Sequence, residues 1–200
     1  MKNIYISLGM MLSVIAANAQ NKDTEQADKL YERLEYVEAA DAYLKLAEKG
    51  DDPYVNRRLA ESYYNVFNSK EAVKWYPKAI AGSGDAELNY AYAQMLKAEG
   101  RYDEANKQMQ QFAAKAPNDQ RAIIFRKDPD YLPKLRNQTK LFDEKLMDIN
   151  DPKYSSFGGV LTDDNTLYFT SARNTARKTY GWNEEPYLDI YTATYNIPKG

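Results

Sequence analysis

The side chains of this sequence that could do chemistry are carboxylates, hydroxyls and amines, because it contains neither histidine nor cysteine. Imidazole bases, thiol nucleophiles, disulfides and Cys/His zinc sites are therefore excluded. The adjacent acids Asp163-Asp164 and Glu184-Glu185 resemble acid–base pairs, but neighbouring acids in hydrophilic loops are usually solvated or form turns. The spacing after Asp163 also lacks the closing glutamate of an EF-hand calcium loop. We expect no catalytic residue, no metal site and no cofactor, and hence no enzyme.

The charge of the chain gives no general attraction to nucleic acid or to anionic lipid. Lysine and arginine total 27 against 29 acidic residues, a net charge of -2. Short basic clusters such as Arg173, Arg177 and Lys178 are interpreted as solvated or salt-bridged surface. The chain is rich in tyrosine, with 18 residues, and tyrosine rings suit both helix packing and binding surfaces.

Residues 1–19 have the pattern of a cleavable export signal. Lys2 gives a positive start, an apolar stretch follows, and Ala17-Asn18-Ala19 is a small-x-small cleavage site. About 14 apolar residues are too few to cross a bilayer, which needs roughly 20. No later segment is apolar enough to span a membrane, and no cysteine follows the signal to carry a lipid anchor. We expect a mature chain that begins at Gln20 and works in the periplasm.

Small residues recur along the next hundred positions at a constant step of 33. An alanine at a fixed place in each of two helices lets the helices of one repeat cross closely, and larger residues one turn away fill the remaining space. The pattern predicts stacked helix-turn-helix units. The four columns in phase are Ala27, Ala60, Ala93; Ala39, Ala72, Ala105; Leu30, Tyr63, Leu96; and Tyr43, Tyr76, Met109.

Residues 21–118 resemble three copies of the tetratricopeptide repeat family. The resemblance implies an all-α solenoid, and with a capping helix we place this domain at residues 20–137. The best copy has the small, turn, aromatic, small and proline residues that are typical of the family pattern, at Ala93, Gly100, Tyr102, Ala105 and Pro117.

Two positions depart from the family pattern. Pro77 interrupts the second helix of the middle repeat, because it deletes one backbone hydrogen bond, and we expect that turn to kink or fray at a cost of up to about 3 kcal/mol. Leu34 and Glu35 stand where the first repeat would usually have a glycine and a polar residue. The boundary of that repeat is therefore less well defined.

Stacked repeats of this kind leave a concave face lined by the first helix of each repeat. Tyrosine and arginine are the residues that most often carry binding hot spots, so this face is a candidate groove for a peptide or protein. The alternative is that it packs on the rest of the same chain. The candidate residues are Tyr31, Arg57, Glu61, Tyr64, Tyr90, Gln94 and Lys97.

Residues 119–138 are predicted to form a capping helix and a linker. The apolar run Ile123-Ile124-Phe125 could cover the open end of the last repeat, as solenoids require. The segment Asp128-Pro129-Asp130 and then Pro133 should stop the helix.

After residue 139 the apolar pattern changes to a period of two, which predicts β-strands. Strands are expected at residues 140–149, 156–161, 166–170 and 187–195, with a hairpin turn at Asp163-Asp164-Asn165. Short links predict antiparallel pairing. Three or four strands cannot close a sheet, so we expect that the gene product continues or that another protein supplies strands.

Residues 150–159, 163–174, Trp182 and residues 186–191 resemble a blade of the WD-like propeller of periplasmic OmpA-family proteins. The predicted fold class is therefore an α+β multidomain chain, with an all-α tetratricopeptide-repeat solenoid followed by the first blade or blades of a β-propeller at residues 138–200. This combination resembles the front of peptidoglycan-associated proteins of type IX secretion and gliding motility.

The resemblance implies a non-enzymatic periplasmic scaffold associated with the outer membrane. Its expected partners are an outer-membrane β-barrel protein and a secreted adhesin or other type IX secretion components. In that family a C-terminal OmpA-like domain, which these 200 residues do not contain, binds peptidoglycan. Two alternatives stay open: a sensor or binding module whose propeller captures a glycan or peptide, and a hydrolase whose active residues lie beyond residue 200.

Overall fold

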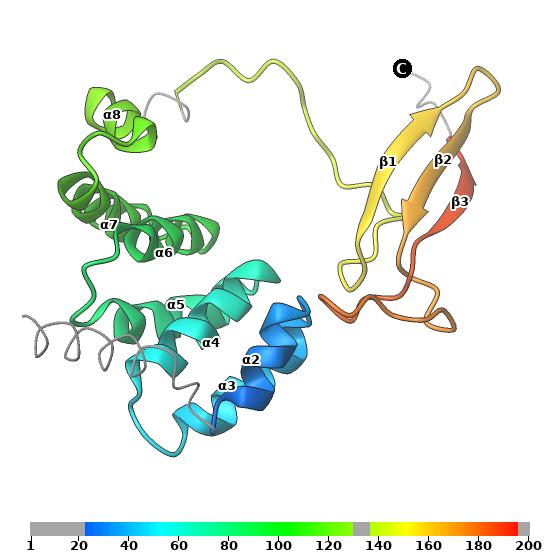
Figure 1. Ribbon diagram of the computed structural model, residues 1–200. Coiled ribbons are helices and arrows are strands. Elements are labelled where there is room, and N and C mark those ends of the chain that lie inside the picture. The colour runs from blue at the N-terminus through cyan, green and yellow to red at the C-terminus, as the bar shows by residue number, and fades with distance from the viewer. Residues whose placement is uncertain (1–22, 130–136, 196–200) are drawn as a thin grey trace, which may run out of the picture. The chain divides into compact units, whose positions relative to one another are not determined.

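The structure of the protein is a computed structural model that describes residues 23–129 and 137–195. The expected export signal and the expected helix stop at Pro133 lie outside the described residues. The chain divides into two compact units between Gln108 and Met109, within helix α7 (Figure 1). The helices are α2 (Glu25–Glu32), α3 (Tyr36–Ala47), α4 (Pro53–Asn65), α5 (Ser69–Ile80), α6 (Ala86–Ala98), α7 (Tyr102–Lys115) and α8 (Gln120–Lys127); the strands are β1 (Ser156–Leu161), β2 (Thr166–Ser171) and β3 (Asp189–Thr194).

Local capping chemistry sets where several helices begin. Asp52 accepts hydrogen bonds from the Tyr54 and Val55 amides, and Pro53 occupies the first turn of α4. Asp119 caps α8 in the same way, and hydrogen bonds from the Arg121 side chain and amide lower the pKa of this carboxyl to about 2. Side-chain caps therefore replace the intrahelical partners that the first amides lack.

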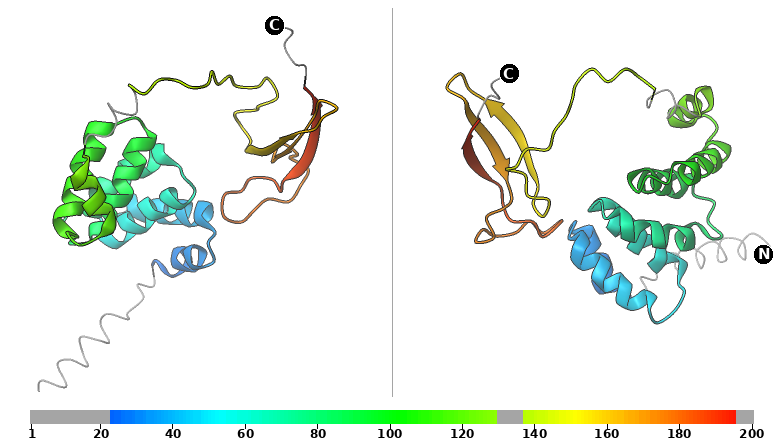
Figure 2. Two further views of the ribbon diagram at one scale, coloured as in Figure 1. Left: turned by 90° about the horizontal axis from the view of Figure 1, so that it is seen from above. Right: turned by 180° about the vertical axis from the view of Figure 1, so that it is seen from behind.

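The helices form consecutive hairpins, each helix packing against the next from α2 to α6 (Figures 1 and 2). The pairs α2/α3, α4/α5 and α6/α7 repeat at the step of 33 residues seen in the sequence. We call α2, α4 and α6 the first helices, and α3, α5 and α7 the second helices. The predicted helix-turn-helix units are confirmed.

The alanine columns are buried within the helical part of the chain. Ala60 and Ala93 of the first helices and Ala39, Ala72 and Ala105 of the second helices are all 0% exposed. A larger side chain at these places would hold the helix axes apart, because interior packing leaves no room for extra methylene groups. The large columns are buried too, with Leu30 half-buried. Their buried members are Tyr63, Leu96, Tyr43, Tyr76 and Met109.

The interruption expected at Pro77 does not occur, because α5 continues past it to Ile80. Pro77 lies in the last turn of the helix, and its exposed ring faces away from the core. The Ala81 amide still donates to the Pro77 carbonyl over 3.3 Å. A proline here deletes only the bond that its own amide would have made, and the remaining bonds hold the last turn.

The turn inside each hairpin uses a left-handed residue, at the same 33-residue step. Leu34 has φ 63°, Phe67 φ 56° and Gly100 φ 71°. Leu34 and Phe67 are large yet 56% and 68% exposed. Only glycine adopts this conformation without a steric cost. The first two turns therefore carry backbone strain that the third avoids.

We expect Gly100→Ala to lower the free energy of unfolding by about 1 kcal/mol, because the added Cβ disfavours the left-handed conformation. No atom lies within 4 Å of the position that this Cβ would take, so the loss measures backbone strain alone. Urea unfolding followed by circular dichroism measures the change. Phe67→Gly should be neutral or stabilising, and an equal loss for both variants would contradict this explanation.

The three strands form one antiparallel sheet in the order β1-β2-β3. The predicted hairpin turn is confirmed, because Asn165 has φ 62° and the Thr162 amide donates to the Thr166 carbonyl. The register of β1 shifts between Phe157 and Val160, where Gly158 has φ 69°. The paired glycines thus form a β-bulge.

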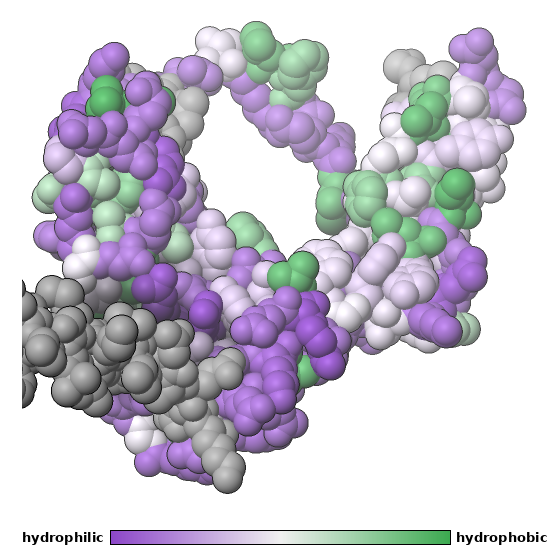
Figure 3. All heavy atoms as spheres, in the orientation of Figure 1, coloured by the Kyte–Doolittle hydropathy of each residue, from purple (hydrophilic) through white to green (hydrophobic). Residues whose placement is uncertain are grey.

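Both faces of this sheet carry apolar side chains. Leu167, Phe169 and Tyr191 share one face, and the Phe169 and Tyr191 rings stack at 5.7 Å. On the other face Tyr168 and Ile190 are 43% and 75% exposed. Figure 3 shows hydrophobic residues at the surface over the strands and over the extended segment that precedes them. A sheet with two apolar faces normally has something packed on each of them.

The strand expected at residues 140–149 is wrong, because this segment is extended without pairing and belongs to no sheet. Its apolar residues come in adjacent pairs, Leu141-Phe142 and Leu146-Met147. Adjacent residues of a strand point to opposite faces, so such pairs do not build one apolar face. The other three strands were predicted at or close to their observed positions, and their antiparallel pairing is confirmed.

Candidate protein-binding surface

The seven candidate residues all lie on the first helices, and all are half-buried. They fall into three columns of the 33-residue step, so each occupies a place that recurs from one first helix to the next. We call this set the first-helix face. By column it consists of Arg57 and Tyr90; Glu61 and Gln94; and Tyr31, Tyr64 and Lys97.

Hydrogen bonds bring Tyr31, Arg57 and Glu61 together. The Glu61 carboxylate accepts from Arg57 Nε at 2.8 Å, from Arg58 Nη1 at 3.3 Å and from the Tyr31 hydroxyl at 3.4 Å. Arg57 also pairs with Asp85, at 3.0 Å, and the Arg58 guanidinium lies 4.5 Å from the centre of the Tyr31 ring. A charged cluster therefore joins α2 to α4, and its Asp85 pair reaches the turn before α6.

The arginines of this cluster are more exposed than the carboxylate that they share. The side chains of Arg57 and Arg58 are 40% and 33% exposed, whereas that of Glu61 is 18% exposed. The Asp85 carboxylate, which pairs with Arg57, is 32% exposed, so the cluster matches its two arginines with two carboxylates.

Tyr64 begins a run of aromatic rings beneath the first-helix face. Its ring meets the Tyr76 ring edge-on at 6.4 Å, and Tyr76 stacks on Tyr92 at 5.7 Å. Tyr76 is 0% exposed, and the described residues give its hydroxyl no hydrogen-bond partner. Burial raises the pKa of this hydroxyl, and Glu61, Tyr64 and Tyr31 raise it further, whereas Arg57 lowers it. The hydroxyl is thus within electrostatic reach of the Glu61 cluster.

The remaining candidates, Tyr90, Gln94 and Lys97, share α6 and join the other four through register. Register along a repeated stack places equivalent residues side by side on consecutive first helices. The predicted phasing of the first-helix face is consistent with this placement, and its use as a binding surface stays a prediction.

Sequence reasoning missed a second polar cluster, centred on Asp28. This carboxylate is only 6% exposed and accepts hydrogen bonds from Tyr43 at 2.5 Å, from Tyr54 at 2.8 Å and from Thr24 at 2.8 Å. The Tyr54 hydroxyl in turn accepts from Arg58. Asp28 thereby ties together α2, α3 and α4. The sequence does contain an indication of this cluster, because Asp28, Glu61 and Gln94 form a polar column at the same step of 33.

Buried tyrosines make the fold sensitive to alkaline pH. Burial and the Asp28 carboxylate raise the pKa of Tyr43, and burial and Glu61 raise that of Tyr76, above the usual value near 10. In the unfolded chain both hydroxyls ionise near pH 10, whereas in the folded chain they keep their protons. Their contribution to stability is therefore complete below pH 10 and declines as the pH rises above it.

We expect the free energy of unfolding to fall steeply between pH 10 and pH 11. Urea unfolding at a series of pH values measures this slope. The double variant Tyr43→Phe/Tyr76→Phe should have a shallower slope than the wild-type chain. An identical slope would show that other groups cause the loss.

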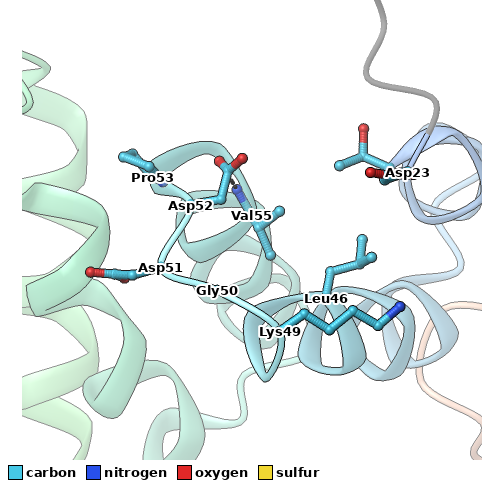
Figure 4. Close-up of a pocket in the computed structure, with 9 residues that line it drawn as sticks. Asp23, Leu46, Lys49, Gly50, Asp51, Asp52, Pro53 and Val55 are labelled. Atoms are coloured by element: carbon cyan, nitrogen blue, oxygen red, sulfur yellow. Dashed lines mark hydrogen bonds between the residues drawn. The ribbon is translucent and has the colours of Figure 1, made fainter.

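A pocket of about 590 Å³ lies where the start of α2, the end of α3 and the start of α4 meet (Figure 4). Asp51 and Asp52 are among its lining residues, and the Asp52 carboxylate lies beside Val55. Asp52 already caps α4, and Asp51 accepts a hydrogen bond from Asn56 at 2.6 Å. These carboxylates therefore serve the α3–α4 turn, and the pocket contains no residue of the first-helix face.

One acid of each pair considered as a catalytic group accepts hydrogen bonds from neighbouring residues. Asp164 accepts from the Thr162 hydroxyl at 2.6 Å and from the Thr166 amide, and Glu185 accepts from the Ser155 hydroxyl at 2.9 Å. Among residues 23–129 and 137–195 no group of acidic side chains is placed to hold a metal ion. No helix of that described part has the length and apolar character needed to cross a membrane.

Comparison with known proteins finds no matching family model and no matching curated protein. Solved structures of tetratricopeptide-repeat proteins do match. One is the first TPR of Spaghetti (RPAP3) bound to the HSP90 peptide SRMEEVD, with a TM-score of 0.47 and 21% identity over 56% of this chain and 90% of its own. Another is the C-terminal part of a TPR repeat-containing protein from Cytophaga hutchinsonii, with a TM-score of 0.41 and 26% identity over 46% of this chain and 37% of its own.

Proposed function

We propose that the protein is a non-enzymatic interaction scaffold that binds a partner protein through the first-helix face. The observation that carries this proposal is that three first helices present tyrosine, arginine and lysine at recurring, half-buried places. Such residues form hot spots because they combine a large contact area with hydrogen-bonding ends. Repeat stacks offer rigid faces of this kind without requiring catalytic groups.

The proposal extends to where the protein works. The export signal expected in residues 1–19 would place the mature chain in the periplasm, associated with the outer membrane. The sequence resemblance to type IX secretion and gliding proteins supports an outer-membrane β-barrel, together with an adhesin or other secretion component, as partner. An OmpA-like domain further along the gene product would then connect this assembly to peptidoglycan.

The sheet supports the propeller part of the proposal. Blades of a propeller pack face to face around a central channel, so a blade with a neighbour on each side needs apolar side chains on both faces. The sheet β1-β2-β3 has them, with Phe169 on one face and Phe157 and Ile190 on the other. We propose that residues 138–200 form the start of such a propeller.

Affinity capture from envelope extract tests the scaffold function. The mature chain, tagged at its C-terminus, is incubated with extract treated or not treated with muramidase, and bound proteins are identified by mass spectrometry. We expect one outer-membrane β-barrel protein to be enriched in both extracts. A variant with Arg57→Ala and Tyr64→Ala should lose it, whereas Lys107→Ala, an exposed change on α7, should retain it. Recovery of no barrel protein would contradict the proposal.

A further inference from the structure

The turns of the first two hairpins expose large apolar side chains and hold them in a strained backbone conformation. Leu34 has φ 63° and Phe67 φ 56°, and the two residues are 56% and 68% exposed. Neither gains the burial that would offset the strain. Glycine would remove the strain, as Gly100 does in the third turn. Two equivalent positions therefore carry residues that the fold of a single chain does not need, which indicates a use in binding.

A hydrogen bond shows that these two turns lie next to each other. The Asn65 amide donates to the Tyr31 hydroxyl over 3.5 Å. The two residues lie in the last turns of α4 and α2, directly before the hairpin turns. Consecutive hairpins of a repeat stack present equivalent turns along one edge. We call residues 32–36 and 65–70 the turn edge.

The two halves of the turn edge have opposite charge. In the first turn Arg33 pairs with Glu35, so Glu32, which is exposed, is the charge that has no ion-pair partner among the described residues. In the second turn the only charged residue is Lys70, which is also exposed and has no ion-pair partner in the described part of the chain. The first turn is therefore negative and the second is positive.

We propose that two copies of this chain associate through the turn edge, related by a two-fold axis. Such a contact uses the same patch of both copies, and the first turn of one copy meets the second turn of the other. Leu34 then packs on Phe67 of the partner subunit, and Glu32 lies within reach of Lys70 of the partner subunit. The symmetry makes each of these contacts twice.

The charges of the turn edge favour a second copy as the occupant. Pairing the turns in the same order, first on first, would bring the two Glu32 side chains together, and like-charge repulsion opposes this. The opposite order brings unlike charges together and covers both apolar side chains at once. Two turns from each copy form a contact smaller than the roughly 1,200 Å² of stable complexes, so the association is weak and reversible.

This inference goes beyond the proposed function. The turn edge contains no residue of the first-helix face, so that face stays available in both copies. A dimer of this kind presents two first-helix faces and is therefore a bivalent scaffold, which can hold two partner molecules or bind one clustered partner more tightly than a single chain would.

Sedimentation velocity of the mature chain, at concentrations from about 5 to about 500 μM, tests the association of a weak interface. We expect the dimer fraction to rise with concentration. Phe67→Gly should weaken association at least about tenfold, because it removes the large side chain of the contact, whereas its urea midpoint should stay unchanged or rise. The matched control is Ile124→Ala on α8, which removes another largely exposed apolar side chain and should leave the dissociation constant within about twofold.

An exchange of charges locates the contact. Glu32→Lys and Lys70→Glu should each weaken association about fivefold or more, because each places like charges opposite one another in both halves of the dimer. The double variant should associate within about twofold of the wild-type chain. An equal mixture of the two single variants should also associate, as a heterodimer, since one chain then carries only cations and the other only carboxylates at these two positions.

A chain that stays monomeric up to about 500 μM would overturn the inference and leave the turn edge to a different protein. Association that Phe67→Gly does not weaken, or that the double charge exchange does not restore, would overturn it too, because the dimer would then form elsewhere. The envelope capture experiment is separate. Recovery of a barrel protein by a monomeric chain supports the scaffold function and rejects only the dimer.

Discussion

Replacing Asp28 by alanine is expected to lower the free energy of unfolding by about 3 kcal/mol, because two buried hydroxyls then lose their acceptor. Tyr43 is 0% exposed and Thr24 is 2% exposed, so water cannot take the place of the carboxylate without opening the helix contacts. Tyr54 is 42% exposed and can turn its hydroxyl to solvent. The loss therefore comes mainly from the two buried donors.

Urea unfolding of the mature chain measures this loss, with Asp41→Ala as the matched control. Asp41 is an exposed aspartate on α3, and its replacement should change the free energy of unfolding by less than about 0.5 kcal/mol. Asp28→Asn should lie between the two, since an amide oxygen can still accept some of the hydrogen bonds. A loss below about 1 kcal/mol for Asp28→Ala would show that the cluster does not hold the helices together.

The alanine columns carry the second large effect. Ala93→Leu should lower the free energy of unfolding by about 3 kcal/mol, because three added carbon atoms must enter a contact that is 0% exposed. The helices of the pair would have to separate, which would also weaken their packing on the preceding pair.

Ala98→Leu is the control for this change, since Ala98 lies in the same helix but is exposed. Leucine is nearly as good a helix former as alanine, so this variant should stay within about 0.5 kcal/mol of the wild-type chain. The thermal midpoints of the two variants give the comparison. Similar midpoints would mean that close helix packing at Ala93 is not required.

The helix pairs could be predicted from the sequence because each repeat needs a small residue at the same position for its helices to pack closely. Ala60 and Ala93 occupy that position 33 residues apart. The period can still be detected where a single residue departs from the pattern. Capping residues such as Asp52 and Pro53 then mark an individual helix start, because their effect is local.

The contacts of the candidate surface could be predicted only in part. A column shows that Arg57 and Glu61 share a face with their equivalents, but it does not show which carboxylate pairs with which donor. The bond from Tyr43 to Asp28 joins different helices, and its formation depends on rotamers that one sequence does not reveal. For the same reason, the sequence did not predict that the Tyr76 hydroxyl lacks a hydrogen-bond partner among the described residues.

Two local predictions failed for identifiable reasons. The break at Pro77 assumed a helix interior, whereas the residue lies near the end of α5, where few hydrogen bonds remain to be lost. The strand at residues 140–149 came from counting apolar residues without requiring strict alternation. Leu141 and Phe142 are adjacent and both largely exposed, as an unpaired extended segment allows.

Site-directed photo-crosslinking in growing cells tests the central claim most directly, namely that the first-helix face is where a partner binds. A photoreactive amino acid is placed at Gln94 on the first-helix face, or at Lys107 or Gln110 on the exposed side of α7, and crosslinked products are compared by gel and mass spectrometry. We expect one discrete product, containing an outer-membrane protein, from Gln94 and none from the two α7 positions. The same product from all three positions, or from α7 alone, would contradict the claim.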